Sequence, residues 1–254
     1  MAKNIIFAMR KGGCGKSTLA FTCAKYIESI GRKALVVDLD PQANLTEALI
    51  GDEEHDMTSN AGMLFEDEFT GTPVKISDHI DLIPNLTDSA GVLCDDSLPI
   101  ESTINVGIHI DNLAIDHDYV VIDTPNMGRG PLLAVIAAGG HVVAPVEPTG
   151  FGLQGLSQLN ALIEEFRIEG GAEIGIGSVV INKYQPGAKV HLMYEQMLRE
   201  VLGDQVLEMV VNNRMPMQSA MANSQPVWLH KGGHGRETGR HVKKVMQDIL
   251  DRVG

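Results

Sequence analysis

Residues 10–18, with the sequence RKGGCGKST, decide how the rest of the chain is interpreted. They follow a short apolar run at residues 5–9 and precede an amphipathic stretch at residues 17–30, so the pattern predicts a strand, a glycine-rich loop and a helix. Glycines allow a tight turn whose N–H groups face phosphate oxygens, and the helix N-terminus adds partial positive charge. The candidate nucleotide-contacting residues of the loop are Gly12, Gly13, Cys14, Gly15, Lys16, Ser17 and Thr18.

This loop is a variant of the usual phosphate-binding loop. The standard pattern has a glycine five positions before Gly15, where this chain has Arg10, and Lys11 adds a second lysine at the start of the loop. Lys16 is expected to reach the β- and γ-phosphates of a nucleotide, and the Ser17 hydroxyl is expected to hold Mg²⁺. A glycine-rich turn without a ligand would not need the strand, the loop and the helix to coincide.

The rest of the chain alternates short apolar runs with longer amphipathic stretches. Strands are predicted at residues 34–39, 119–122, 141–146, 174–181 and 206–211, and helices at residues 132–138, 153–167, 190–202 and 237–253. Strands that are apolar throughout and alternate with helices indicate an α/β fold, with a mostly parallel twisted sheet covered by helices on both faces. We expect a single domain over residues 1–254, with an irregular insertion at about residues 51–118.

Two acidic motifs are predicted at the same edge of this sheet as the loop. Asp38 and Asp40 lie in the sequence VVDLDPQ at residues 36–42, and Asp123 ends the strand at residues 119–122. Carboxyl ends of parallel strands face the ligand crevice of an α/β sheet, and a carboxylate placed there binds Mg²⁺ through water. An Asp at a strand end is a turn or helix cap about as often as it is a metal ligand. These acids therefore predict a Mg²⁺ site only in combination with the adjacent phosphate-binding loop.

Composition limits the class of protein. The 254 residues are 44% hydrophobic and 21% charged, which is typical of a globular protein and excludes a disordered chain. Three cysteines are too few for a disulfide framework, and no apolar run suits a signal peptide or a membrane span, so we expect a cytoplasmic protein. The net charge of −13 is uneven: residues 1–33 carry +6, residues 34–166 carry −21 and residues 167–254 carry +2. This distribution fits a local basic patch on an acidic body.

With these motifs in view, the sequence resembles the ParA/MinD family of deviant Walker ATPases, and within it the ParA branch. The resemblance rests on KGGCGKST at residues 11–18, VVDLDPQANLT at 36–46, YVVIDTP at 119–125, GFGLQGLSQL at 150–159, VVIN at 179–182 and PMQSAMANSQPV at 216–227. It covers most of the chain except roughly residues 51–118. Because no helix-turn-helix precedes the first strand, we expect the short form of the family.

The resemblance implies a Mg²⁺-dependent ATPase that holds ATP between the two subunits of a homodimer. The residues that match the family's functional positions are Lys11, which would contact the partner's nucleotide; Lys16 and Ser17, with the loop roles given above; Asp40, which would position the attacking water; Asp38 and Asp123, in the Mg²⁺ shell; and Asn182 and Pro216, on the adenine side. An ATP-bound dimer and an ADP-bound monomer would then form a switch, with hydrolysis stimulated by a ParB-like adaptor. The implied function is the partition or positioning of cargo such as plasmid or chromosomal DNA.

ParA-like dimers usually hold DNA non-specifically through a basic patch, which would make the ATP-bound form nucleoid-associated. The candidates in this chain are Lys189, Arg199, Arg214, Lys231, Arg236, Arg240, Lys243 and Lys244. The alternative is that these side chains form a solvated helix face with no ligand. A second alternative within the same resemblance is the positioning of a cargo other than DNA.

Two further classes of protein are alternatives to a ParA-like ATPase. A MinD-like membrane switch would use an amphipathic helix at residues 240–254, but a stripe of this kind more often packs on its own domain, so we expect no membrane partner. A carrier similar to the nitrogenase iron protein would need paired cysteines to bridge a cluster, and Cys94 stands alone. The family often has Val in place of Cys14 and Thr in place of Ser17. After Asp123 the chain reads TPNMGRG, where a second proline is common, so we expect this switch region to behave differently.

Overall fold

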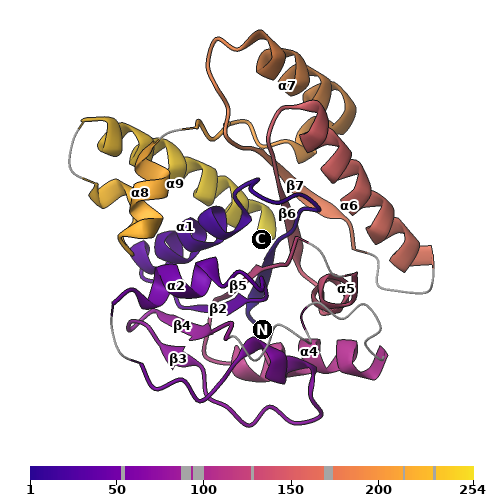
Figure 1. Cartoon of the computed structure of the whole chain (residues 1–254), viewed down its shortest axis with the longest axis vertical. Coiled ribbons are helices and arrows are strands. Elements are labelled where there is room, and N and C mark those ends of the chain that lie inside the picture. Colours follow the sequence, from indigo (N-terminus) through magenta and orange to yellow (C-terminus); the bar gives the residue numbers. More distant parts are fainter. Residues whose placement is uncertain are drawn as a thin grey trace.

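The computed structural model describes residues 1–52, 55–86, 93, 100–126, 129–168, 174–213, 215–230 and 233–254. Within these residues one sheet has the strand order β3-β4-β2-β5-β1-β6-β7 (Figure 1). The strands are β1 (Lys3–Phe7), β2 (Ala34–Asp38), β3 (Val74–Lys75), β4 (Ile80–Ile83), β5 (Tyr119–Asp123), β6 (His141–Val146) and β7 (Ile176–Ile181). Every neighbouring pair is parallel except β3 and β4. The predicted α/β fold with a mostly parallel sheet is confirmed.

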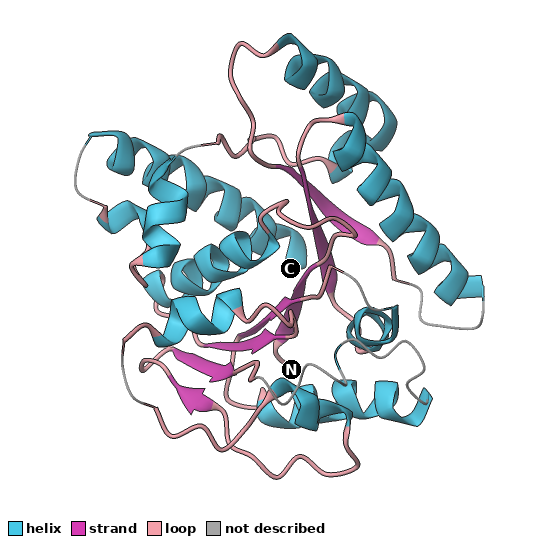
Figure 2. Cartoon of the chain, viewed as in Figure 1, coloured by secondary structure: helices cyan, strands magenta, loops and turns pink. Residues whose placement is uncertain are grey.

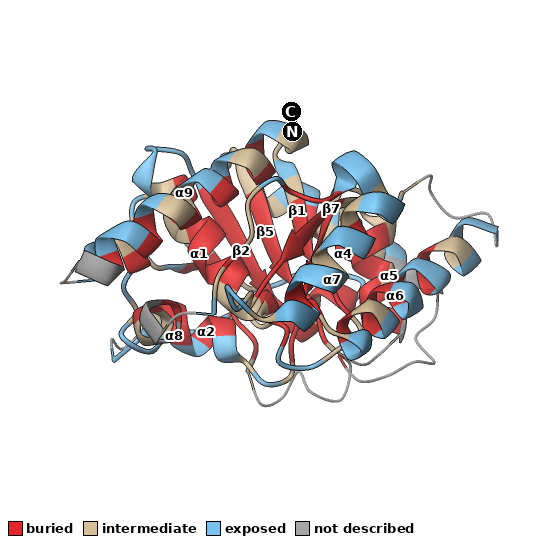
Figure 3. Ribbon diagram, turned by 90° about the horizontal axis from the view of Figure 1, so that it is seen from above, coloured by how far each residue is buried: buried red, intermediate tan, exposed pale blue. Residues whose placement is uncertain are grey.

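Helices cover both faces of the sheet, as Figures 1 and 2 show. The α-helices are α1 (Lys16–Ser29), α2 (Asn44–Ile50), α4 (Ile100–Leu113), α5 (Arg129–Ala137), α6 (Gly150–Ile168), α7 (Lys189–Leu202), α8 (Met215–Ala222) and α9 (Gly233–Val253). Successive residues of a strand point to opposite faces. Ile6 therefore packs in a core with residues of α4, α5 and α6, while Ile5 and Phe7 pack in a second core with residues of α1, α2, α8 and α9. Figure 3 shows the buried sheet between these layers.

The apolar stripe of the last helix, α9, belongs to the core. Val245, Met246 and Ile249 have no exposed surface, and Val242 and Leu250 are at most 4% exposed. All five pack against the sheet with α1. The prediction that this stripe packs on its own domain is confirmed, and the stripe is not available to a lipid surface. Within the described residues, every helix falls short of the length and apolar character that a bilayer-spanning segment needs.

Two predictions about secondary structure were wrong. The range 51–118 contains more regular structure than expected, because β4 pairs in parallel with β2 inside the sheet, β3 pairs with β4, and α4 packs on one face. Residues 206–211 do not form a strand. The N–H groups of Leu207 and Val211 donate to carbonyls of β7, at Val179 and Ile181, but the chain bends away between these two points. Val206, Leu207 and Val211 are still buried, whereas Met209 and Val210 are partly exposed.

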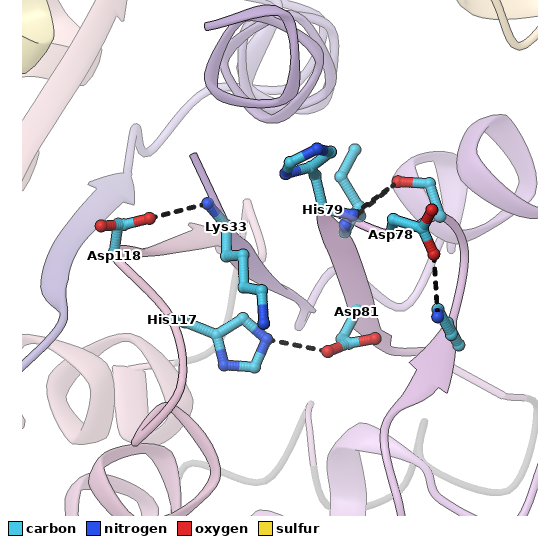
Figure 4. A network of polar contacts seen from close by, with 9 residues as sticks. Lys33, Asp78, His79, Asp81, His117 and Asp118 are labelled. Carbon is cyan, nitrogen blue, oxygen red and sulfur yellow. Dashed lines mark hydrogen bonds and ion pairs between the residues drawn. The ribbon is translucent and has the colours of Figure 1, made fainter. Parts of the chain in front are cut away.

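Polar contacts close the end of the sheet that is remote from the loop (Figure 4). Nε2 of His117, just before β5, lies 2.9 Å from Oδ2 of Asp81 in β4. The N–H of Lys33, just before β2, donates to Oδ2 of Asp118 at 2.8 Å. These contacts join the starts of three neighbouring strands, and so help to fix the register that sets where their carboxyl ends meet.

Candidate nucleotide-binding site

The glycine-rich loop connects β1 to α1 in the conformation that a phosphate-binding loop requires. Gly13 and Gly15 have φ angles of +72° and +95°, in the left-handed region that glycine adopts without strain. Gly15 has a second constraint, because a side chain there would overlap the amide of Asn182. The first turn of α1 carries no acidic residue. No carboxylate of the helix itself therefore competes for the partial positive charge that its N-terminus directs at the loop.

Strand register brings the predicted acids together beside this loop. In the pairing of β2 with β5, Asp38 lies opposite Asp123, and the N–H of Leu39 donates to the carbonyl of Asp123 at 2.9 Å. Asp38 and Asp123 have no exposed surface, and Asp40 is 4% exposed. Because both strands end at the same edge of the sheet as β1, three carboxylates converge on the side of the loop that opens α1.

A buried polar network holds the segment that carries Asp38 and Asp40. Oδ2 of Asp38 accepts the N–H of Thr46 at 2.8 Å and its hydroxyl at 2.7 Å, and Oδ1 accepts the N–H of Asp40 at 3.1 Å. Asn85, which follows β4, donates its backbone N–H to the Thr46 hydroxyl at 2.9 Å and its side-chain amide to the carbonyl of Asp40 at 2.6 Å. Burial raises the pKa of Asp38 to about 6, although these hydrogen bonds favour its charged form. Neither Thr46 nor Asn85 was predicted as a site residue from the sequence.

Asp123 differs from Asp38 in that its carboxylate lacks hydrogen-bond partners. Both of its oxygens are buried, and neither has a hydrogen bond of standard geometry. Burial raises the pKa of Asp123 well above its usual range, and the neighbouring Asp38 carboxylate raises it further. Lys16 and the Ser17 hydroxyl lower this pKa in part, because both lie close to the carboxylate. A buried carboxylate without hydrogen bonds is costly unless a cation reaches it.

These residues fit a Mg²⁺ ion that also binds a nucleotide. Mg²⁺ takes oxygen ligands and is commonly held by one or two carboxylates together with substrate phosphates. Asp123 offers two buried oxygens without partners, and the Ser17 hydroxyl lies near it. Among the described residues, no group of three or more His, Cys, Asp or Glu side chains is placed to hold a metal ion. An ion here would therefore depend on phosphate oxygens for part of its shell.

Lys16 is buried at the centre of this edge. It is 4% exposed, and its ammonium group donates to Oδ1 of Asn126, which follows β5 by three residues. Asn126 lies within the run TPNMGRG that departs from the family pattern, but no role was predicted for its side chain. The structure therefore adds one more polar group to the surroundings of the loop lysine.

A cavity of about 280 Å³ lies between the glycine-rich loop, residues 182–183, residues 211–213 and α8. It is lined by Gly13, Gly15, Lys16, Ser17, Thr18, Leu19, Asp40, Asn44, Asn126, Asn182, Lys183, Val211, Asn212, Asn213, Met217 and Met221. Asn182 is 6% exposed and donates its side-chain amide to the carbonyl of Cys14 at 2.7 Å. Pro216 is the second residue of α8, the helix that supplies Met217 and Met221. Both predicted adenine-side positions thus belong to elements that border the cavity.

The two buried cysteines near the site are structural. Cys14 is 1% exposed and Cys23 has no exposed surface. Burial raises the pKa of the Cys14 thiol and raises that of Cys23 to about 12, which keeps both thiols protonated and unreactive at neutral pH. Cys94 lies outside the described residues.

Lys11 lies at the rim of the loop rather than in the cavity. Its ammonium group is 3.4 Å from Oε2 of Glu147, just before α6, and the two side chains are 28% and 31% exposed. Partly exposed pairs of this kind contribute about 1 kcal/mol or less. Lys11 is therefore held in its own chain only weakly and is accessible from outside.

The predicted DNA-binding residues divide between two helices that lie apart in Figures 1 and 3. Lys189 and Arg199 are in α7, and Arg236, Arg240, Lys243 and Lys244 are in α9; Arg214 and Lys231 lie outside the described residues. Arg199 pairs with Glu195, and its guanidinium group donates to the carbonyls of Leu207 and Glu208. Lys243 lies over the Trp228 ring, 4.7 Å from its centroid.

The fold and this site define a nucleotide-binding protein of the P-loop class, and comparisons with known proteins identify the family. A protein-family profile described as an AAA domain matches residues 2–176, which is more than half of the chain. The chromosome-partitioning ATPase Soj of Thermus thermophilus is 25% identical over 252 residues, 99% of this chain and 96% of that protein. The chain belongs to the ParA/MinD family of deviant Walker ATPases, as the motifs predicted.

Solved structures confirm the fold. Apo McdA of Cyanothece has a TM-score of 0.80 and 19% identity, and the match covers 98% of this chain and 100% of that one. Cobyrinic acid a,c-diamide synthase of Mycobacterium smegmatis, solved with a bound ATP analogue and magnesium, has a TM-score of 0.75 and 18% identity, with 98% and 95% coverage. At this level of identity the likeness concerns the fold alone.

Proposed function

We propose that this chain is a ParA-like ATPase that forms an ATP-sandwich homodimer, binds DNA non-specifically and drives the partition or positioning of cargo. A ParB-like adaptor stimulates its hydrolysis. The observation that carries the proposal is the convergence of Lys16, Asp38, Asp40 and Asp123 around a glycine-rich loop. Family membership and the partition ATPases among its relatives support it.

The loop holds the phosphates in this proposal. Its N–H groups and the N-terminus of α1 bind phosphate oxygens, and Lys16 contacts the β- and γ-phosphates. Ser17 and Asp123 hold Mg²⁺, which when bound neutralises charge on the phosphates. Asp38, whose carboxylate already accepts three hydrogen bonds, would add negative charge beside the ion. Asn182 and the α8 segment that begins near Pro216 border the adenine.

Asp40 positions the attacking water. Its carboxylate is buried at the edge of the sheet, and the network of Thr46 and Asn85 fixes its backbone. Phosphoryl transfer requires mainly that the water be aligned and the developing charge be neutralised, so a rigidly held carboxylate suits this role.

Lys11 completes the site of the partner subunit. Because it is accessible and only weakly paired with Glu147, it can leave that contact when a second nucleotide-bound subunit approaches. A lysine supplied in trans adds positive charge at the transferred phosphate. Dimerisation and hydrolysis are then coupled, and loss of the γ-phosphate removes what holds the subunits together.

The DNA contacts of this proposal centre on α9. Arg236, Arg240 and Lys244 are exposed and spaced four residues apart, so they lie on one face of the helix. That face is opposite the buried stripe that anchors α9 to the sheet. Lys189 on α7 is a separate candidate, whereas Arg199 serves the local structure around residues 207–208.

Nucleotide titration of the Lys16→Ala variant tests the site. We expect wild-type protein to bind a fluorescent ATP analogue with Mg²⁺, and Lys16→Ala to lose this binding while keeping its circular dichroism spectrum. Lys25→Ala, on the same helix but paired with Glu28, is the matched control and should bind normally. Full ATP affinity in Lys16→Ala would contradict the proposed site.

A further inference from the structure

Asn126 lies on the loop after β5, next to the lysine of the glycine-rich loop. Its side chain comes from the loop after β5 and reaches Lys16, whose ammonium group donates to its Oδ1. Lys16 is 4% exposed, so few groups are able to contact it. Asn126 also lines the cavity that the loop borders.

The other end of the same amide faces the start of the loop. A methyl group in place of the Gly12 hydrogen would lie 3.8 Å from Nδ2 of Asn126. The amide group therefore lies between Lys16 and Gly12. In the proposed function Lys16 contacts the β- and γ-phosphates of the nucleotide that this loop holds, so the amide beside Lys16 lies near the terminal phosphate.

The chemistry of an amide suits this place. Its oxygen accepts from the lysine, and its NH₂ group offers two donors to phosphate oxygens. Unlike a carboxylate, it does not repel the γ-phosphate. ADP is one phosphate shorter, so a donor at the terminal position has a partner in ATP and none in ADP.

We propose that Asn126 is a specificity-determining residue that binds the terminal phosphate of ATP through its side-chain amide and so discriminates ATP from ADP. This inference rests on the proposed function, since it requires a nucleotide in the loop. Asn126 follows Asp123 by three residues, so the same short segment contacts both the ion and the phosphate that distinguishes the two states.

The test is the ratio of affinities for AMPPNP and ADP, both measured with Mg²⁺ by calorimetry at protein concentrations where the mass is monomeric. A general loss of nucleotide affinity changes both constants together, so the ratio, rather than either affinity alone, reports recognition of the third phosphate. In Asn126→Ala we expect the preference for AMPPNP over ADP to fall at least about tenfold, as loss of a hydrogen bond to a charged acceptor implies. Asn126→Asp should lower the ratio further, because a carboxylate repels the γ-phosphate.

Asn160→Ala, an exposed asparagine in α6, is the matched control and should keep the wild-type ratio. An unchanged ratio in Asn126→Ala, with or without a common shift of both affinities, would overturn the inference while leaving nucleotide binding intact. Failure of wild-type protein to bind either nucleotide would instead overturn the proposed function. Melting curves of each variant show that the comparison is made between folded proteins.

Discussion

Replacing Asp123 by Asn should stabilise the nucleotide-free protein, although it removes a proposed Mg²⁺ ligand. Neither oxygen of Asp123 has a hydrogen bond of standard geometry, and the nearby Lys16 ammonium group and Ser17 hydroxyl offset the burial of its charge only in part. The neighbouring Asp38 shows the direction of the gain. The pKa of Asp38 rises from 3.8 to about 6 on folding, which costs about 3 kcal/mol once the pH exceeds that folded value. Asp123 has the same burial and lacks the hydrogen bonds that offset the cost at Asp38.

We therefore expect Asp123→Asn to raise both the free energy of unfolding and the melting temperature at pH 8. The gain depends on pH in a defined direction. A carboxyl whose pKa is raised by folding destabilises the folded state increasingly as pH rises above the unfolded value of 3.8. The difference between variant and wild type should be small near pH 4 and grow toward pH 8.

Urea unfolding at four pH values measures this difference directly. Asp116→Asn, at an exposed position, is the control and should follow wild type within about 0.5 kcal/mol. Addition of Mg²⁺ with an ATP analogue should stabilise wild type more than Asp123→Asn, because only the wild-type carboxylate gains a cation. A variant that is less stable than wild type at pH 8, or a difference that shrinks as pH rises, would refute the reasoning.

Three further predictions concern the hydrogen bonds around Asp38, the role of Asp40 in hydrolysis and the basic face of α9. Thr46→Val removes a hydroxyl that bonds Asp38 and accepts from Asn85, so it should lower the free energy of unfolding by about 3 kcal/mol in urea, whereas Thr58→Val at an exposed site should change it little. Asp40→Ala should bind AMPPNP normally but release phosphate at least about 100-fold more slowly; unchanged turnover would exclude its role in positioning water. Arg240→Glu with Lys244→Glu should weaken DNA binding in fluorescence anisotropy and reduce the slope of log affinity against log salt by about 1 per lost phosphate contact, and an unchanged slope would move the DNA surface elsewhere.

The parts of the fold that the sequence predicted are those with strong local signals. The strand, loop and helix around residues 10–18 combine glycine chemistry with hydrophobic periodicity, and the strands that end at Asp38 and Asp123 are continuous apolar runs. Strand β4 was missed because it is only four residues long and carries Asp81. Its place in the sheet comes from pairing with β2, which is a long-range contact that no local pattern reports.

The opposite error at residues 206–211 has a related cause. The run is mostly apolar, and Val206, Leu207 and Val211 are buried as the pattern indicated, but only two of its N–H groups reach β7. Hydrophobicity reports burial, whereas a strand also needs a continuous ladder of hydrogen bonds.

In the candidate site, too, the residues within local motifs were predicted, whereas those brought together only by the fold were not. Lys11, Lys16, Asp38, Asp40 and Asp123 were found because motifs fix their types and spacing. Thr46 and Asn85 are 39 residues apart in sequence, and single polar residues carry no periodic signal. Asn85 would have been a candidate had β4 been predicted, since it follows the carboxyl end of that strand.

The proposed function requires two copies of this chain to close around ATP, and a measurement of particle mass with and without AMPPNP shows whether they do. Wild-type protein with Mg²⁺ should shift from about 27.4 kDa to twice that mass when AMPPNP is added, and should not do so with ADP. Lys11→Ala, with its fold intact, should bind AMPPNP and remain at the single-chain mass. A wild-type mass that is the same with AMPPNP, with ADP and without nucleotide would contradict the account.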